Sequence, residues 1–224
     1  MPKFLTNILI YFSKIHSRNG LYPFLLEEFN AISPRSDVLN IGAGGVVEAM
    51  LYDRTKGKEI KIASLDIDPN REPDIVADIH SWNSVAKYDI IVMSEVLEHC
   101  HSPHEAIAAI MRALRPSGML ILTTPFIFPI HDAPNDYFRF TRYGIRHLLT
   151  EFNEIKIRDR NLWSESIIVL LVRLVMDDSI IVRLASPIFI LAAYCIWPFA
   201  WVVARMLPTR SMTTGYCVTA KKGN

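Results

Sequence analysis

Two carboxylates and one imidazole fall at close spacing in the segment Glu95-Val-Leu-Glu-His99. A helical turn would bring Glu95, Glu98 and His99 to one edge, because residues three and four apart lie on the same face of a helix. Carboxylate oxygens and an imidazole nitrogen can hold a divalent cation, which lowers the pKa of a bound hydroxyl. In the alternative, these side chains only shape a pocket. The segment therefore predicts either a metal site or a pocket wall.

A second group of reactive side chains lies between Pro125 and Thr141, a stretch too rich in proline and polar residues for regular structure. His131 is the preferred general base, because imidazole titrates near neutral pH. It could also supply a fourth metal ligand. Asp132, Asp136 and His99 are the substitute bases.

The same loop carries Asp136, Tyr137 and Arg139, which we treat as candidate catalytic residues. In the alternative, Asp136 and Arg139 form a structural ion pair, Tyr137 and Phe138 fill the core, and Thr141 caps the next helix.

A glycine-rich turn indicates a nucleoside-binding crevice. The segment from Asp37 to Gly45 is a buried-strand pattern that runs into glycines, and Asp66 follows roughly 20 residues later, where a second strand should end. Val47 stands where a dinucleotide fingerprint requires a third glycine, which argues against a pyrophosphate and leaves room for a smaller ligand.

The turn resembles motif I of the class I S-adenosylmethionine-dependent methyltransferases, of the type 11 kind. Further segments match this family in order as far as Pro125, including Val76 to Ile79, Tyr88 to His99 and Arg112 to Gly118. The resemblance implies S-adenosylmethionine as cofactor, with Asp66 at the ribose hydroxyls and Asp78 against adenine. The cofactor residues that it implies are Asn40, Gly42, Ala43, Gly44, Asp66, Ile67, Asp78, Ile79, Ser94 and Glu95. At Asn40 the family usually carries Asp or Glu, so the chain departs from the pattern there.

Two finer resemblances bear on the acceptor. The loop pattern made by His131, Pro134, Asp136, Tyr137, Arg139 and Thr141 resembles a subgroup of bacterial methyltransferases often placed with surface-polysaccharide synthesis. The ExxEH order resembles the metal-binding motif of small-RNA 2′-O-methyltransferases and ubiquinone-pathway O-methyltransferases. These resemblances imply methylation of a hydroxyl oxygen.

The hydropathy pattern predicts an α/β fold. Short β-branched runs alternate with helical patterns, which is typical of a parallel sheet covered on both faces. The predicted strands are 37–41, 60–66, 74–77, 88–93, 119–124, 154–159 and 214–220, with a helix over 141–152. By resemblance this is the Rossmann-like seven-stranded methyltransferase sheet, whose last strand inserts antiparallel beside the fifth.

Four ranges describe the predicted domain organisation. N-terminal cap helices occupy 1–35, because the apolar run at Phe4 to Phe12 is too short and interrupted for a signal peptide. The methyltransferase core occupies 36–160, a hydrophobic helical insertion 161–208, and the last strand 209–224.

The insertion has the composition of a membrane-facing element. Ala185 to Ala204 contains no charged residue and is near the length that spans a bilayer. A single crossing would place the last strand on the wrong side of the membrane, so we expect either peripheral membrane contact or packing on protein. Pro187 and Pro198 favour a broken, non-spanning element.

Composition narrows the function further. A formal net charge of +1 and a pI near 7.8 give little electrostatic reason to bind nucleic acid. Three scattered cysteines indicate a reducing compartment. We therefore expect a cytoplasmic methyltransferase, peripheral to the inner face of the membrane, that acts on oxygen of a sugar, glycan or lipid-linked acceptor. The alternatives are a membrane scaffold with a degenerate methyltransferase fold and a nicotinamide-dependent oxidoreductase.

Overall fold

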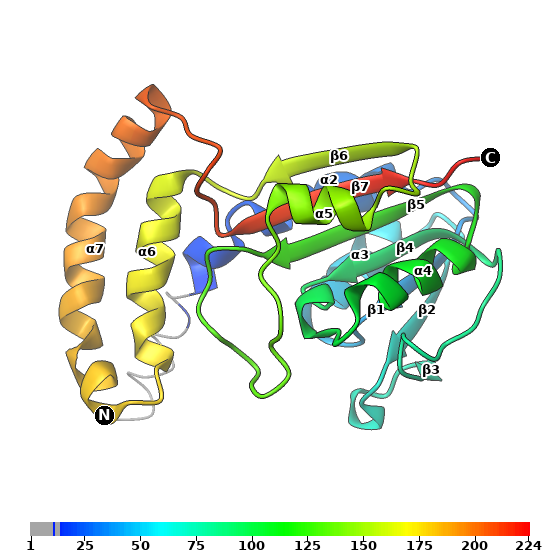
Figure 1. Cartoon of the computed structure of the whole chain (residues 1–224), viewed down its shortest axis with the longest axis horizontal. Coiled ribbons are helices and arrows are strands. Elements are labelled where there is room, and N and C mark those ends of the chain that lie inside the picture. The colour runs from blue at the N-terminus through cyan, green and yellow to red at the C-terminus, as the bar shows by residue number, and fades with distance from the viewer. Residues whose placement is uncertain (1–10, 12–13) are drawn as a thin grey trace. The chain divides into compact units, whose positions relative to one another are not determined.

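The computed structural model of the chain describes residues 11 and 14–224, and its internal contacts divide it into two units (Figure 1). One unit comprises Met1–Tyr22, Phe126–His131 and Asp159–Gly215. The other comprises Pro23–Pro125, Asp132–Arg158 and Tyr216–Asn224. The predicted helical stretch at Phe4 to Phe12 lies outside the described residues apart from Tyr11, and residues 14–18 are helical.

A seven-stranded sheet has the order β3-β2-β1-β4-β5-β7-β6. The strands are β1 (Asp37–Ile41), β2 (Lys61–Asp66), β3 (Ile75–Val76), β4 (Tyr88–Ser94), β5 (Leu114–Pro125), β6 (Glu154–Asp159) and β7 (Gly215–Lys221). The pairings among β1 to β5 are parallel. β7 runs antiparallel to β5, because Ser117 N–H donates to Gly223 O while Phe126 N–H donates to Thr214 O. The predicted methyltransferase sheet is confirmed.

β5 begins earlier than the pattern predicted. The strand starts at Leu114, directly after the helix that ends at Ala113, and its pairing with β4 shifts register between Tyr88 and Ile90. The irregular part contains Ser117, whose φ is 61°, so the expected turn is a bulge inside the strand. Beyond it, Leu120, Ile121 and Leu122 are fully buried, as befits a strand covered on both faces.

Helices cover both faces of the sheet in the second unit. In Figure 1, α2 (Leu21–Ala31) and α3 (Gly45–Thr55) lie on one face, and α4 (Pro103–Ala113) and α5 (Arg142–Leu148) on the other. α4 begins with Pro103 in its first turn, where a missing N–H costs nothing. α5 is shorter than predicted at both ends, because Thr141 is its N-cap and accepts a hydrogen bond from Gly144 N–H. The capping alternative for Thr141 is therefore what the structure shows.

The insertion forms a helical hairpin in the first unit. α6 (Trp163–Arg173) leads through a 3₁₀ turn at Leu174–Met176 into α7 (Ile180–Met206). The two helices and the 3₁₀ turn share a core of Ile168, Val172, Val175, Ile190 and Ala193, against which Leu171, Tyr194 and Trp197 pack.

The expected break in this segment was wrong, because α7 is one continuous helix of 27 residues with Pro187 and Pro198 inside it. A proline at position 187 removes the N–H that would bond to the carbonyl of Arg183. Ser186 Oγ donates to that carbonyl at 2.8 Å instead, so the freed acceptor is satisfied within the helix.

Candidate functional site

The glycine turn joins β1 to α3 at the carboxyl edge of the sheet. Gly42, Gly44 and Gly45 have φ values of 92°, 80° and 76°, a region that favours glycine. A Cβ on Gly42 would lie 2.6 Å from Val96 Cγ2, whereas one on Gly44 or Gly45 would meet nothing within 4 Å. The turn thus presents bare backbone to open space, which is what a closely approaching nucleoside ligand requires.

Asp66 ties the end of β2 to this turn. Its carboxylate is 9% exposed, and it accepts hydrogen bonds from Ala43 N–H and Asp68 N–H, at 2.9 Å each. Arg71 approaches it at 3.8 Å and also donates to Ala43 O. The neighbouring Ile67 is exposed and can line an apolar wall. The ribose role of Asp66 stays a prediction, and the structure adds a supporting role in the turn.

The structure shows a local reason for asparagine, rather than an acidic residue, at position 40. The side chain is 1% exposed, and its Nδ2 donates to Gly42 O at 3.2 Å. A carboxylate at this position could not donate that hydrogen bond. Glu48, which the sequence reasoning missed, accepts from Gly44 N–H at the start of α3, where an acidic residue in the first helical turn was the available signal.

Asp78 and Ile79 follow β3. Asp78 Oδ1 accepts from the His80 backbone N–H and contacts the His80 ring Nδ1 at 2.6 Å, and the first of these bonds is the main reason its pKa is lowered. Ile79 is buried. The His80 ring stacks on His101, and its Nε2 accepts from Ser102 N–H. Asp78, His80 and His101 are near one another, but both His80 ring nitrogens are already hydrogen-bonded.

Glu95 does not belong to a helical turn, contrary to prediction. The 3₁₀ turn covers only Leu97–His99, and Glu95 precedes it with a φ of 56°, in the left-handed region. Its carboxylate accepts from Thr123 Oγ1 at 3.0 Å, and Ser94 Oγ shares that hydroxyl at 2.8 Å. Non-glycine residues held at positive φ cluster at functional sites. The strand end, rather than a helix face, therefore aims this carboxylate.

Glu98 and His99 lie beside each other at the same edge. Glu98 is fully buried, and its Oε2 accepts from Thr124 Oγ1 at 3.3 Å. His99 Nδ1 lies 2.7 Å from Asn135 O, so Nδ1 carries the proton and Nε2 is the basic nitrogen of the neutral ring. That Nε2 lies 3.8 Å from Glu98 Oε1.

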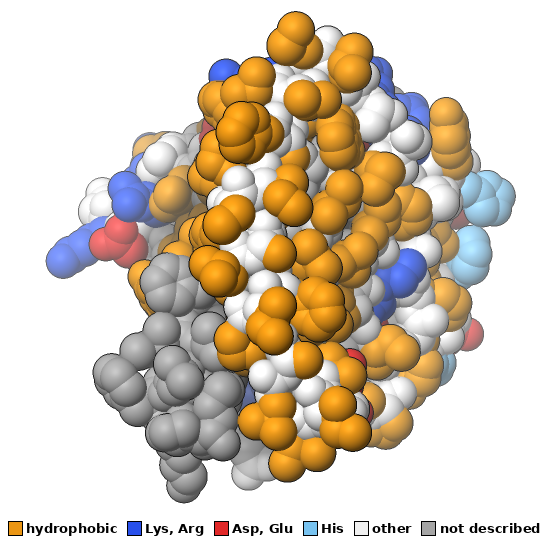
Figure 2. Space-filling view, turned by 90° about the vertical axis from the view of Figure 1, so that its left-hand side faces the viewer, with side chains coloured by type: hydrophobic (Ala, Val, Ile, Leu, Met, Phe, Trp, Pro, Cys, Tyr) orange, Lys and Arg blue, Asp and Glu red, His pale blue; other side chains and the backbone are white. Residues whose placement is uncertain are grey.

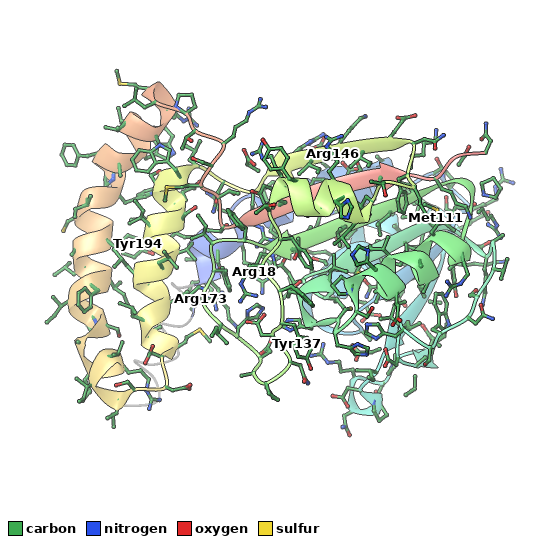
Figure 3. All side chains as sticks on the ribbon, viewed as in Figure 1. Arg18, Met111, Tyr137, Arg146, Arg173 and Tyr194 are labelled. Carbon is green, nitrogen blue, oxygen red and sulfur yellow. The ribbon has the colours of Figure 1, made fainter. Side chains whose placement is uncertain are left out.

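Asp136 and Arg139 form a bidentate ion pair, with both nitrogen-to-oxygen distances 2.6 Å and the Asp136 side chain 1% exposed. The hydrogen bonds to Asp136 raise the pKa of Arg139, and the charges of Glu98 and Glu95 raise it further. The structural alternative for this pair is thus observed. Tyr137 is half exposed and does not fill the core. Its N–H donates to Glu98 O, which holds the loop at this edge (Figure 3).

The carboxylates of Glu95, Glu98 and Asp136 all act on the guanidinium of Arg139, so these four side chains together carry a negative formal charge. Such an excess complements a positively charged ligand. His131 belongs to the other unit, where its ring meets Phe128 edge-on at a centroid distance of 5.3 Å. Its role as a base or metal ligand stays a prediction.

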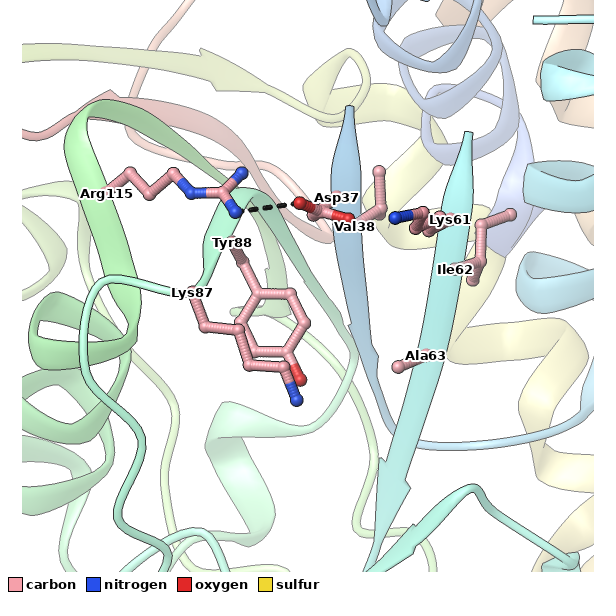
Figure 4. Close-up of a pocket in the computed structure, with 8 residues that line it drawn as sticks. All are labelled: Asp37, Val38, Lys61, Ile62, Ala63, Lys87, Tyr88 and Arg115. Atoms are coloured by element: carbon pink, nitrogen blue, oxygen red, sulfur yellow. Dashed lines mark hydrogen bonds and ion pairs between the residues drawn. The ribbon is translucent and has the colours of Figure 1, made fainter. Parts of the chain in front are cut away.

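A cavity at the opposite edge of the sheet is a separate feature (Figure 4). It is lined by the first residues of three strands, Asp37, Lys61 and Tyr88, and by Arg115. Arg115 bonds to Asp37 at 2.8 Å and to Asp89 at 2.7 Å, which joins β1, β4 and β5. The predicted cofactor residues lie at the carboxyl ends of the strands, so this cavity is not the site predicted for them.

Comparison with known proteins identifies the class. Residues 14–157 match the family described as "Methyltransferase domain", which is more than half of the chain. The chain belongs to this family, and it carries an S-adenosylmethionine-dependent methyltransferase domain. Its cofactor is S-adenosylmethionine.

Individual relatives are distant. The chain is 24% identical over 126 residues to a ubiquinone biosynthesis O-methyltransferase of Hydrogenovibrio crunogenus, covering 50% of the chain and 52% of that protein. A phosphoethanolamine N-methyltransferase 2 of Haemonchus contortus, solved with S-adenosyl-L-methionine, has a TM-score of 0.59 at 14% identity, over 92% of this chain and 53% of that one. An Archaeoglobus fulgidus SAM-dependent methyltransferase has a TM-score of 0.57 at 15% identity, over 95% and 99%. The chain thus spans about half the length of the first two, and these structures share its fold.

The sheet order separates the chain from a nicotinamide-dependent oxidoreductase. The doubly wound dinucleotide-binding fold continues from strand 5 to a parallel strand 6. Here the antiparallel β7 lies between β5 and β6. Together with the family match, this rejects the oxidoreductase alternative.

Proposed function

We propose that the domain transfers a methyl group from S-adenosylmethionine to a hydroxyl oxygen of a sugar, glycan or lipid-linked acceptor. The observation that carries this proposal is the group of proton-accepting side chains at the carboxyl ends of β4 and β5. A hydroxyl is a weak nucleophile until its proton leaves, so an O-methyltransferase needs a base at this edge.

The cofactor fits the residues present. The bare backbone of Gly42 to Gly45 accepts close approach, Asp66 offers a carboxylate to the ribose hydroxyls, and Asp78 with Ile79 borders the adenine. S-adenosylmethionine supplies a methyl group already activated on a sulfonium. The negative charge of Glu95, Glu98 and Asp136 complements that cation and excludes anionic competitors.

His131 is the proposed base, and His99 is the substitute that the geometry favours. The hydrogen bond from Nδ1 to Asn135 O orients the His99 ring, and Nε2 is the proton-accepting nitrogen of the tautomer that carries its proton on Nδ1. Asp136 and Arg139 are proposed to position the acceptor loop, since their ion pair fixes the segment whose Tyr137 N–H bonds to Glu98 O. The half-exposed Tyr137, whose hydroxyl donates to Asn135 Oδ1 at 2.9 Å, is proposed to contact the acceptor.

A divalent metal held by Glu95, Glu98, His99 and His131 is a second proposal about the same edge. The approach of His99 Nε2 to Glu98 Oε1 at 3.8 Å suits two ligands of one ion. Such an ion would lower the pKa of the acceptor hydroxyl. Loss of turnover on chelation, restored by added Mg²⁺ or Zn²⁺, supports the metal; unchanged turnover contradicts it.

The acceptor can be sought directly. Untargeted mass spectrometry of cell-envelope extracts, with and without the gene, should show a species that differs by one methyl group. The relative that carries O-methyltransferase in its name supports an oxygen acceptor, and the loop resemblance supports a surface polysaccharide. A methylated amine or carbon in place of a methylated hydroxyl would refute the oxygen assignment.

Two variants separate the candidate bases. His131→Ala should lower kcat at least tenfold with little change in the Kd for S-adenosylmethionine, and His99→Ala should lower it less. If His99→Ala abolishes turnover while His131→Ala does not, the assignment reverses. A folded preparation that fails to bind S-adenosylmethionine calorimetrically would instead support the non-catalytic scaffold.

A further inference from the structure

The exposed surface of α7 is apolar over most of its length. Within the described stretch Leu184–Val203, every exposed residue is apolar. These residues are Leu184, Pro187, Ile188, Phe189, Leu191, Ala192, Cys195, Ile196, Pro198, Phe199, Val202 and Val203. Figure 2 shows this surface as a nearly continuous field of apolar side chains. We call it the α7 face.

The α7 face is far more exposed than a core helix would be. Among residues 11 and 14–224, α7 is the one helix long and apolar enough to cross a membrane, and only 17% of its most apolar window is buried. At 1.5 Å per residue, the stretch between Arg183 and Arg205 extends about 30 Å. Large continuous apolar surfaces of this kind mark an interaction site.

We propose that the α7 face lies flat in the headgroup and acyl boundary of a lipid bilayer with anionic headgroups, on the cytoplasmic side. A protein partner would normally meet a polar rim around an apolar centre, and the α7 face has no polar exposed side chain between its two terminal arginines. Lipid chains need no such rim. The proposal concerns location and stands apart from the choice of methyl acceptor.

The charges at the ends of the face fit a membrane surface. Arg183 and Arg205 border the apolar stretch, and Arg210 follows four residues after α7 ends. The Arg205 guanidinium lies 4.1 Å from the Trp201 ring centroid, so an aromatic ring and a cation meet at that end. Tryptophan and arginine are the side chains that anchor proteins at the headgroup level.

The connections of the hairpin exclude a single crossing. Arg160 N–H donates to Gly215 O at 2.9 Å, and Asn161 Oδ1 accepts from Thr214 N–H at 3.0 Å. The chain that enters the hairpin at Arg160 and Asn161 therefore meets the chain that leaves it at Thr214 and Gly215. The chain must leave and return on the same side of any bilayer.

A hairpin that crosses fully is also disfavoured. α6 and its 3₁₀ turn together extend about 22 Å, less than the roughly 30 Å of the hydrocarbon core. Arg173, the last residue of α6, is labelled in Figure 3. It bonds to Ser17 Oγ at 3.0 Å and lies over the Phe128 ring at 4.7 Å from its centroid, so the tip is held on other parts of this unit. Crossing would carry Asp177 and Asp178 through hydrocarbon at high cost.

Vesicle binding of the full chain tests the proposal. An environment-sensitive fluorophore on Cys195, which is exposed on α7 while Cys100 and Cys217 are buried, should shift to the blue on adding vesicles of phosphatidylglycerol and phosphatidylcholine. In flotation, binding should be strongest to the vesicles with phosphatidylglycerol at low salt. It should be weaker to vesicles of pure phosphatidylcholine, and weaker to the phosphatidylglycerol vesicles when the salt concentration is raised. No blue shift and no flotation would overturn the proposal.

Matched variants locate the contact. Ile188→Gln with Phe199→Gln, at positions 71% and 76% exposed, should weaken vesicle partitioning roughly tenfold or more. Val85→Gln, at a position 73% exposed in the other unit, should leave it unchanged. Equal effects of the two changes would refute the α7 face as the contact.

Two further outcomes separate the competing arrangements. Asp178→Cys, made together with Cys195→Ser, should react with an impermeant maleimide added outside the vesicles; protection until detergent is added would show a crossing hairpin and refute the flat one. Analytical sedimentation tests whether a second copy covers the α7 face instead. A dimer that does not bind vesicles, and that dissociates when Ile188→Gln and Phe199→Gln are made together, would show this and refute the lipid contact. Methyl transfer to a water-soluble acceptor should survive these variants, so failure here leaves the proposed function standing.

Discussion

Replacing Asp66 with alanine tests the cofactor edge most directly, because two effects of the change can be measured separately. The carboxylate accepts the N–H groups of Ala43 and Asp68 at 2.9 Å each. A hydrogen bond to a charged group contributes about 1.5–3 kcal/mol, and water can replace part of the bond to Asp68. We expect Asp66→Ala to lower the free energy of unfolding by about 2–3 kcal/mol without ligand.

The second effect concerns the ligand. If the ribose hydroxyls donate to the same carboxylate, its loss should raise the Kd for S-adenosylmethionine about 10- to 100-fold, or about 1.4–2.8 kcal/mol. Titration calorimetry measures this change on protein that is shown to be folded. Ligand at 100 times the original Kd stabilises the unchanged protein by about 2.7 kcal/mol, but a variant with 30-fold weaker binding by only about 0.9 kcal/mol.

Asp74→Ala is the matched control. Asp74 Oδ2 accepts from Ser64 N–H at 2.8 Å and from Ser64 Oγ at 3.0 Å, so it also supports β2 through a carboxylate. It should cost about 1–2 kcal/mol of stability and change the Kd by less than about twofold. If Asp66→Ala loses stability while its Kd stays that of the unchanged protein, Asp66 only supports the turn and the ribose lies elsewhere.

Three other predictions address the loop, the insertion and the cysteines. Asp136→Ala removes one partner of the bidentate pair with Arg139 and should lower the free energy of unfolding, measured by urea titration, by about 2–3 kcal/mol. A loss under about 0.5 kcal/mol would show that solvent screens this pair and that it contributes little to stability. Ser186→Ala should cost about 1 kcal/mol on its own but almost nothing when Pro187→Ala restores the missing N–H, and additive losses in this double-mutant cycle would contradict the repair of the helix. In the absence of vesicles, only the exposed Cys195 should react rapidly with a thiol reagent between pH 7 and 9. Cys100 and Cys217 are buried, and burial raises the pKa of Cys100 to about 12, which keeps it a neutral thiol. Rapid reaction of two thiols per chain would refute this prediction.

The sheet was predictable because local sequence dictates it. The strand pattern of β1, β2 and β4 came from short β-branched runs, and their predicted bounds agree with the structure within a residue. The glycine turn was equally visible, since positive φ at Gly42 and Gly44 leaves few other residues possible. Such features depend on the residue itself and on its immediate neighbours.

The details of the site depend on partners that are distant in the sequence. The predicted helical face of Glu95, Glu98 and His99 failed because Thr123 and Thr124, from the neighbouring β5, hold the two carboxylates. In the sequence, Asn40 was only a departure from the family pattern, and the position of Gly42 O explains its amide. The continuous α7 also eluded the sequence, because a serine next to a proline carries no obvious sign of helix repair.

The place of β7 in the sheet has a consequence for synthesis. β7 lies between β5 and β6 but is the last strand to leave the ribosome, after the whole of α7. Until it arrives, β5 has an open edge, β6 has no neighbour, and the apolar helix is already made. Open strand edges and apolar surface together invite aggregation. The nascent chain therefore passes through a vulnerable interval that lasts until β7 has been made, and a chaperone or an early lipid contact would protect it most during that interval.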